Sequence, residues 1–218
     1  MATRAAKSAV RPPLLPKDLE AKVLDDLDGV EIERCRLEAC ELASSRADNV
    51  RFDAVHIVGG SWSETQLTQL RWLDVLCERC DLSLLEWPKA KWTRVEMRDC
   101  RLSGAKLLEA ELDHVRFIEC QLEYAIFSAT RFRQVSFERC RLQEAAFVGA
   151  DLTGTTFIGC ELRGVDFTKA KLQGADVRSS TLQQVSVGAG DVRGLVVNKE
   201  QASVLAQLFG LVVRETEG

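Results

Sequence analysis

The stretch CDLSLLEWPKAKWTRVEMRDC, residues 80–100, decides the fold, because its pattern recurs along the chain. Five cysteines follow one another at every twentieth position, each with a leucine two positions later: Cys80, Cys100, Cys120, Cys140 and Cys160. A finer period lies inside the twenty, since 34 consecutive five-residue units run in register from Val30. Nearly every unit has a small or aliphatic residue followed two positions later by a bulky apolar one. Such internal repeats indicate a repeat architecture.

A period of five fits neither a helix nor a flat strand. Helices place apolar residues at i, i+3, i+4 and i+7, whereas strands alternate with a period of two. Here two apolar residues of every five are separated by one position, and the other three are mostly polar or small. The pattern predicts a short extended piece followed by a corner, with both apolar side chains pointing inward. Four such pieces close a square coil, and parallel ladders then join coils about 4.8 Å apart.

Residues twenty positions apart are sorted by size, as stacked coils require. Like residues recur in a column because each coil offers its neighbour the same shape. The aromatic columns contain Phe52, Trp72 and Trp92; Phe117, Phe137 and Phe157; and Phe127, Phe147 and Phe167.

Several units resemble the repeats of a known family. Ala150-Asp151-Leu152-Thr153-Gly154 and Ala170-Lys171-Leu172-Gln173-Gly174 are similar to the A-(D/N)-L-x-x consensus of pentapeptide-repeat proteins, and the resemblance covers about residues 30–197. It implies a right-handed, four-sided parallel β-helix. We therefore predict an all-β fold, a right-handed quadrilateral parallel β-helix (a pentapeptide-repeat solenoid with four units per coil), followed by a short C-terminal α-helix.

Three segments are expected along the chain. Residues 1–29 form an N-terminal extension that caps the first coil, residues 30–197 form the β-helix, and residues 198–218 form a C-terminal helix and tail. Exposed coil ends invite edge-to-edge association, so a cap is needed. Basic residues between Arg4 and Arg11 leave a transit peptide as an alternative reading of the N-terminus. No run of 18 apolar residues indicates a membrane span, and we expect a cytoplasmic protein.

The C-terminal segment has the pattern of an amphipathic helix. Asn198 and Gln201 have the spacing of a capping box, and Gly210 suits the end of a helix. The apolar face must be buried, either against the last coil or against a second copy. The resemblance implies the second case, because family members with a comparable helix form end-to-end dimers, so we expect a homodimer. The candidate residues for this cap or dimer contact are Ala202, Leu205, Leu208, Phe209 and Leu211.

Eight cysteines raise the question of a metal or redox site. Seven occupy small inward positions and Cys77 occupies a bulky one, so we interpret them as reduced, buried small hydrophobes. Stacked cysteines are close enough for a disulfide, but parallel side chains give it poor geometry. Cys77-x-x-Cys80 resembles half of a zinc site, yet no second pair or histidine has suitable spacing. We expect no metal and no cofactor.

No catalytic constellation is apparent in the sequence. His56 and His114 fall at outward positions on different sides, about three coils apart, and cannot form one site. Nucleophile elbows, phosphate-binding glycine loops and metal-binding histidine pairs are absent. A packed rod also lacks the concave pocket that small ligands prefer. We predict that the protein is not an enzyme.

Without a catalytic or metal site, function is expected to depend on contacts made by the surface of the rod. Formal charges on the four predicted sides lie between −3 and +1, and the side that runs from Ala47 to Val187 is neutral. This side carries an apolar strip across adjacent coils, formed by Leu108, Ile126, Ala129, Ala146 and Val148. Contiguous exposed apolar patches often mark contact surfaces, whereas aliphatic residues also favour sheets in general.

Two functions are compatible with these observations. The first is a non-enzymatic scaffold that binds an unknown protein partner through its faces. The second follows from the resemblance, because family members of the quinolone-resistance type bind DNA gyrase as dimeric mimics of duplex DNA. A DNA mimic needs a strong negative field, and the net charge here is only −4. We therefore prefer the scaffold, with no direct contact to nucleic acid, and keep gyrase binding as the alternative.

Overall fold

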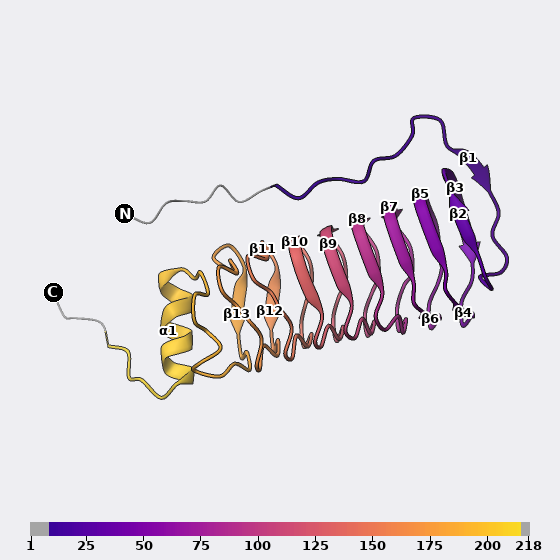
Figure 1. The fold of residues 1–218 in the computed structure, drawn as a ribbon. Coiled ribbons are helices and arrows are strands. Elements are labelled where there is room, and N and C mark those ends of the chain that lie inside the picture. Colours follow the sequence, from indigo (N-terminus) through magenta and orange to yellow (C-terminus); the bar gives the residue numbers. More distant parts are fainter. Residues whose placement is uncertain (1–8, 215–218) are drawn as a thin grey trace.

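The structure, a computed structural model, describes residues 9–214 of the chain. The described residues form a parallel β-solenoid of about eight coils followed by one short helix (Figure 1). This confirms the repeat fold predicted from the five-residue period. The basic residues Arg4 and Lys7, on which the transit-peptide alternative partly rests, lie outside the described residues.

Strands are short in this fold because the chain turns repeatedly around the rod. The elements are β1 (Glu20–Lys22), β2 (Glu31–Glu33), β3 (Cys35–Glu41), β4 (Arg46–Asp48), β5 (Arg51–Ser61), β6 (Gln66–Thr68), β7 (Arg71–Glu78), β8 (Lys91–Arg98), β9 (Glu111–Ile118), β10 (Arg131–Glu138), β11 (Thr156–Ile158), β12 (Glu161–Arg163), β13 (Thr181–Gln183) and α1 (Lys199–Leu208).

Successive coils pair in parallel, and from β2 onward each paired strand residue lies opposite its counterpart four repeat units later. In β7 and β8 Trp72 lies opposite Trp92, and in β9 and β10 Phe117 lies opposite Phe137. One nine-stranded sheet follows the order β1-β3-β5-β7-β8-β9-β10-β11 with β2 paired to β5, and two smaller sheets pair β12 with β13 and β4 with β6. The constant shift places residues of one sequence column directly above one another.

A residue in the left-handed conformation recurs at the corners of the coil. It precedes the small inward residue, as at Glu64 with φ 58°, Asp74 with φ 53° and Gly164 with φ 70°. This conformation costs L-residues roughly 1–2 kcal/mol each, so the ladders and the core must offset the cost. At Gly164 a Cβ atom would also collide with the carboxylate of Glu144, one coil earlier.

Aromatic stacks fill the centre of the rod. The ring centroids of Phe117 and Phe137 are 4.8 Å apart, those of Phe137 and Phe157 are 5.0 Å apart, and both pairs are nearly coplanar at 4°. Trp72 and Trp92 stack at 5.1 Å nearer the N-terminal end. These rings are almost completely buried, so the predicted inward columns form the core.

The cysteine ladder, Cys80 to Cys160, runs along one corner of that core. The Sγ atoms of Cys100, Cys140 and Cys160 lie 3.5, 3.3 and 3.3 Å from carbonyl oxygens of the preceding coil. Ser180 continues the column, because its hydroxyl donates to the carbonyl of Phe157 at 3.0 Å. All eight cysteines are buried and unbridged. A thiol therefore fills this corner and also gives a carbonyl a weak donor.

Different elements cover the two ends of the rod. At the first coil β1 pairs with β3, with Glu20 opposite Cys35, and Leu24 and Leu27 are buried beside it. At the last coil α1 packs by its buried residues Gln201 and Leu205. The side-chain amide of Gln201 donates to the carbonyls of Val177 and Ser180 at 2.8 and 2.7 Å. Both ends thus have partners for strand groups that would otherwise stay unpaired.

The boundaries of α1 match the sequence signals. Asn198 is the N-cap, and its side chain and that of Gln201 each accept a hydrogen bond from the other's backbone N–H. Gly210 follows the helix with φ +81°. No helix among residues 9–214 has the length and apolar character needed to cross a membrane.

We expect Phe137→Ala to lower the free energy of unfolding by about 3–5 kcal/mol, the usual cost of deleting a buried phenylalanine ring. Urea melts measure it. Tyr124→Ala is the control, because Tyr124 is 65% exposed and should change stability by less than about 0.5 kcal/mol. A loss below about 1 kcal/mol for Phe137→Ala would contradict the stacked core.

Candidate interaction surfaces

An extended segment, the N-terminal strap (residues 9–19), runs back along the rod toward its C-terminal end (Figure 1). The backbone N–H of Leu14 donates to Asp74 Oδ1 at 2.8 Å, and that of Arg11 donates to His114 Nδ1 at 3.1 Å. These two acceptors lie two coils apart along the rod. Pro12, Pro13 and Pro16 favour such an extended chain. The sequence predicted that residues 1–29 cap the first coil, and it did not predict that residues 9–19 run along the side of the rod.

Asp74 connects the strap to the rod. Its carboxylate forms a bidentate pair with Arg94, at 2.6 and 2.5 Å, in addition to the bond from Leu14. The hydrogen bonds from Arg94 to Asp74 raise the pKa of the Arg94 guanidinium. Asp74 occupies an outward position, yet its side chain is only 8% exposed. This burial arises because the strap lies over the side chain.

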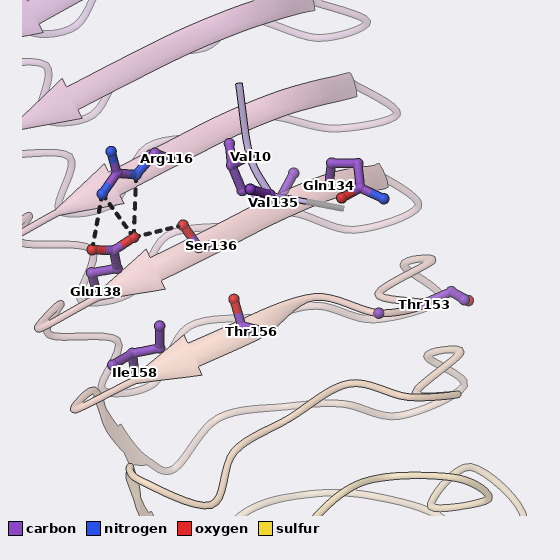
Figure 2. A pocket seen from close by; sticks show the side chains of 11 residues that line it. Val10, Arg116, Gln134, Val135, Ser136, Glu138, Thr153, Thr156 and Ile158 are labelled. Atoms are coloured by element: carbon purple, nitrogen blue, oxygen red, sulfur yellow. Dashed lines mark hydrogen bonds and ion pairs between the residues drawn. The ribbon is translucent and has the colours of Figure 1, made fainter. Parts of the chain in front are cut away.

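A chain of ion pairs crosses the strands next to the strap. Glu96 is buried and pairs with Arg98 and with Arg116, the latter at 3.0 Å. Arg116 also pairs with Glu138 at 3.2 Å, and the hydroxyl of Ser136 donates to Glu138 at 3.0 Å (Figure 2). Charges in neighbouring coils therefore neutralise one another across β8, β9 and β10.

An open groove with a volume of about 390 Å³ lies between the strap and the side of the rod. Figure 2 shows Val10 of the strap over the strand that carries Val135 and Ser136, with Ile158 on the next coil. The sequence predicted no concave pocket of the kind that small ligands prefer; the groove is open, and the strap forms one wall of it. Among the lining residues Ser136 bonds to a carboxylate that Arg116 already holds, and no histidine is present. The lining therefore contains no serine–histidine pair.

The histidines lie at separate places, as their sequence positions indicate. His56 Nε2 lies 2.8 Å from Glu78 Oε2 with only 14% of its side chain exposed, so it is more buried than an ordinary surface histidine. His114 accepts the hydrogen bond from the strap. Each histidine thus has a local structural contact.

The apolar strip lies on the side of the rod. Ile126 and Ala146 form a parallel bridge between neighbouring coils, and the N–H of Ala129 donates to the carbonyl of Val148 at 2.9 Å. Leu108 is 37% exposed. On the N-terminal side the strip is bordered by two ion pairs, between Lys106 and Glu86 and between Lys89 and Glu109. Ile126 thus lies beside Ala146 and Ala129 beside Val148, with these neighbours partly exposed, whereas Ser128 separates Leu108 from Val148 in their column.

A second apolar surface, the C-terminal patch, follows the capping face of α1. Leu205 is buried against the rod, whereas Ala202 is exposed on the helix. The other large apolar side chains are exposed: Leu208 by 47%, Phe209 by 36%, Leu211 by 63%, Val212 by 80% and Val213 by 45%. Of the residues predicted to form a cap or a dimer contact, Leu205 caps the last coil and the others remain exposed.

Three thiols gather inside the rod. The Sγ atoms of Cys77, Cys80 and Cys100 all lie within 4.8 Å of one another, and all three residues are buried. The Cys77-x-x-Cys80 spacing indicates the first two, whereas Cys100 lies outside any short-spaced metal motif. The coil repeat was the signal that places Cys100 beside them.

Comparison with protein families agrees with the geometry. The model of the pentapeptide repeat region matches residues 70–147 and 130–200. The chain belongs to the pentapeptide repeat family. No curated protein matches this pentapeptide repeat protein.

Three solved structures of other proteins are similar to this chain. A trypsin-treated form of QnrB1, described as a plasmid-mediated fluoroquinolone resistance protein, is 23% identical, with 91% of this chain and 100% of that chain covered and a TM-score of 0.39. Rfr23 from the cyanobacterium Cyanothece 51142 is 16% identical, with coverage of 64% and 91% and a TM-score of 0.36. HetL from Nostoc sp. strain PCC 7120, involved in regulating heterocyst differentiation, is 15% identical, with coverage of 74% and 88% and a TM-score of 0.37.

We expect Asp74→Ala to release the strap, because the Leu14 N–H loses a charged acceptor. Hydrogen bonds to charged groups contribute about 1.5–3 kcal/mol, so exchange of the Leu14 amide should accelerate about tenfold or more. Hydrogen exchange followed by NMR measures it. The control, Asp113→Ala, removes a carboxylate that also interacts with Arg94 and should leave Leu14 unchanged. Equal exchange rates in both variants would contradict the role of Asp74.

Proposed function

We propose that this pentapeptide repeat protein is a non-enzymatic scaffold that binds another protein through its surface and forms a homodimer through its C-terminal end. The observation that carries this proposal is the pair of apolar surfaces on a rod whose interior is filled. Soluble proteins rarely leave contiguous apolar patches without a contact to make. The described residues otherwise expose mostly charged and polar side chains that pair between coils.

The C-terminal patch supports the homodimer. Leu205 and Gln201 already seal the last coil, so Leu208, Phe209 and Leu211 are not needed for the cap. A patch at the end of a rod can meet the same patch of a second copy around a two-fold axis, since isologous contacts are self-complementary. The product is a rod of double length with the apolar strips of both copies still accessible.

The apolar strip supports binding of a different protein. It lies on the side of the rod, with Lys106 and Glu109 at one end and Asp166 and Lys169 at the other. An apolar centre with a polar rim is the usual anatomy of a protein interface. The partner expected here presents an apolar surface along several coils, and its identity is not specified by these residues.

The DNA-mimic alternative requires carboxylates that are free to imitate phosphates. On the most acidic side, Asp81 pairs with Arg101 at 3.1 Å and Glu123 pairs with Arg141 at 3.0 Å. Such pairs weaken the negative field along the rod, so the charge pattern favours the scaffold over binding to DNA gyrase. A gyrase supercoiling assay distinguishes the two, since inhibition at micromolar protein would favour the mimic.

Leu208→Asp combined with Phe209→Asp should halve the mass measured by light scattering, because charges in the patch oppose its burial. Lys199→Glu, at the other end of α1, is the control and should leave the mass of the dimer unchanged. A wild-type protein that has the monomer mass at every concentration tested would contradict the dimer.

Ile126→Asp should abolish recovery of the partner in pull-downs from host lysate, because it places a charge within the apolar strip. Gln121→Asp introduces the same side chain at the equivalent position of the preceding repeat unit, on another side of the rod, and should retain recovery. For each protein recovered by the wild type, the amounts recovered by the two variants are compared. Equal recovery by both would show that the strip is not the contact.

A further inference from the structure

The thiol triangle, Cys77, Cys80 and Cys100, differs from the rest of the cysteine ladder. In the ladder each sulfur follows the previous one along the rod, so three successive ladder sulfurs lie in a row. Cys77 instead occupies a bulky inward position, in the column of Ile57, Met97 and Phe117. Its sulfur lies 3.9 Å from that of Cys100. Among the described residues these three make up the one group of three or more histidines, cysteines or acidic residues whose ligand atoms all lie within 4.8 Å of one another.

The size of the triangle suits a three-coordinate centre. With bonds to sulfur of about 2.3 Å and bond angles of roughly 95°, as in a three-coordinate centre that keeps a lone pair, the three sulfurs lie about 3.4 Å apart. The sulfurs of Cys77 and Cys100 are 3.9 Å apart and no separation exceeds 4.8 Å, so the triangle contracts when such a centre binds. The sulfurs thus already surround a point that such a centre could occupy.

The surroundings of the triangle restrict the charge of the ligand. Cys77, Cys80 and Cys100 are 0%, 2% and 1% exposed, and the group contains no histidine or carboxylate. An apolar interior disfavours a net charge that has no partner. A complex that is neutral overall therefore fits better than one that leaves two negative charges.

We propose that the thiol triangle binds trivalent arsenic as a tris-thiolate. Arsenous acid, As(OH)₃, reacts with the three thiols: each As–O bond breaks, each As–S bond forms, and each thiol proton leaves with a hydroxyl group as water. Arsenic stays trivalent, no electron is transferred, and the product carries no net charge. Zinc fits less well, because structural zinc sites use four ligands and the triangle supplies three.

The ladder provides a matched control for this site. Cys100 and Cys140 are both 1% exposed, and each thiol bonds to a carbonyl of the preceding coil. Replacing either by alanine removes the same atoms from nearly the same environment. Cys140 is not part of the triangle, so its loss should leave arsenic binding intact. Cys77→Val removes the third vertex and keeps a side chain of comparable size in the bulky column.

The test uses the full-length, reduced chain, refolded from urea with sodium arsenite and then dialysed. Native mass spectrometry should find one arsenic retained per chain in the wild type and in Cys140→Ala, and none in Cys100→Ala or Cys77→Val. At a hundredfold excess over Kd, arsenite should raise the melting temperature of the two binding proteins by about 5–10 °C. Circular dichroism confirms that each variant is folded.

Three results would overturn the proposal. One is a wild type that retains no arsenic under these conditions. Another is equal loss of arsenic from Cys140→Ala and Cys100→Ala, which would assign binding to the ladder as a whole. The third is retention of Zn²⁺ in a parallel refolding with zinc chloride while arsenite is not retained, which would indicate a four-coordinate site.

Discussion

Hydrogen bonding between coils is the constraint on which this structure depends. Each coil must place its N–H and carbonyl groups opposite those of the next coil, and a shift by one residue would turn the inward columns outward. The left-handed residue at the corners makes this possible, because it redirects the chain while the ladder continues. Its local cost is offset by the ladder and by the core that closure creates.

The same constraint determines where the surface can vary. Inward columns repeat nearly the same residues, whereas acids and bases at outward positions pair between neighbouring coils, as Arg116 does with Glu96 and with Glu138. Such pairing holds the coils together and weakens the electrostatic field along the sides of the rod. Apolar side chains at outward positions are therefore the exception, and the strip and the C-terminal patch stand out against a neutralised surface.

The inward pattern made the fold predictable from sequence, because a strict period leaves few geometries. The aromatic columns, the short strands and the capping box of Asn198 and Gln201 all follow from local spacing. The strap did not follow, because residues 9–19 lack the repeat and their position depends on two bonds, to Asp74 and His114. The thiol triangle was missed for a related reason: its third member comes from the next coil, at a separation that ordinary metal motifs do not use.

The register of the coils is the central claim, and aromatic NOEs test it most directly. The account predicts NOE cross-peaks between the rings of Phe117 and Phe137 and between those of Phe137 and Phe157, whose centroids are 4.8 and 5.0 Å apart. It also predicts no direct cross-peak between Phe117 and Phe157, which are two coils apart. A spectrum without the two neighbouring cross-peaks, in a folded and fully assigned sample, would contradict the stacked solenoid.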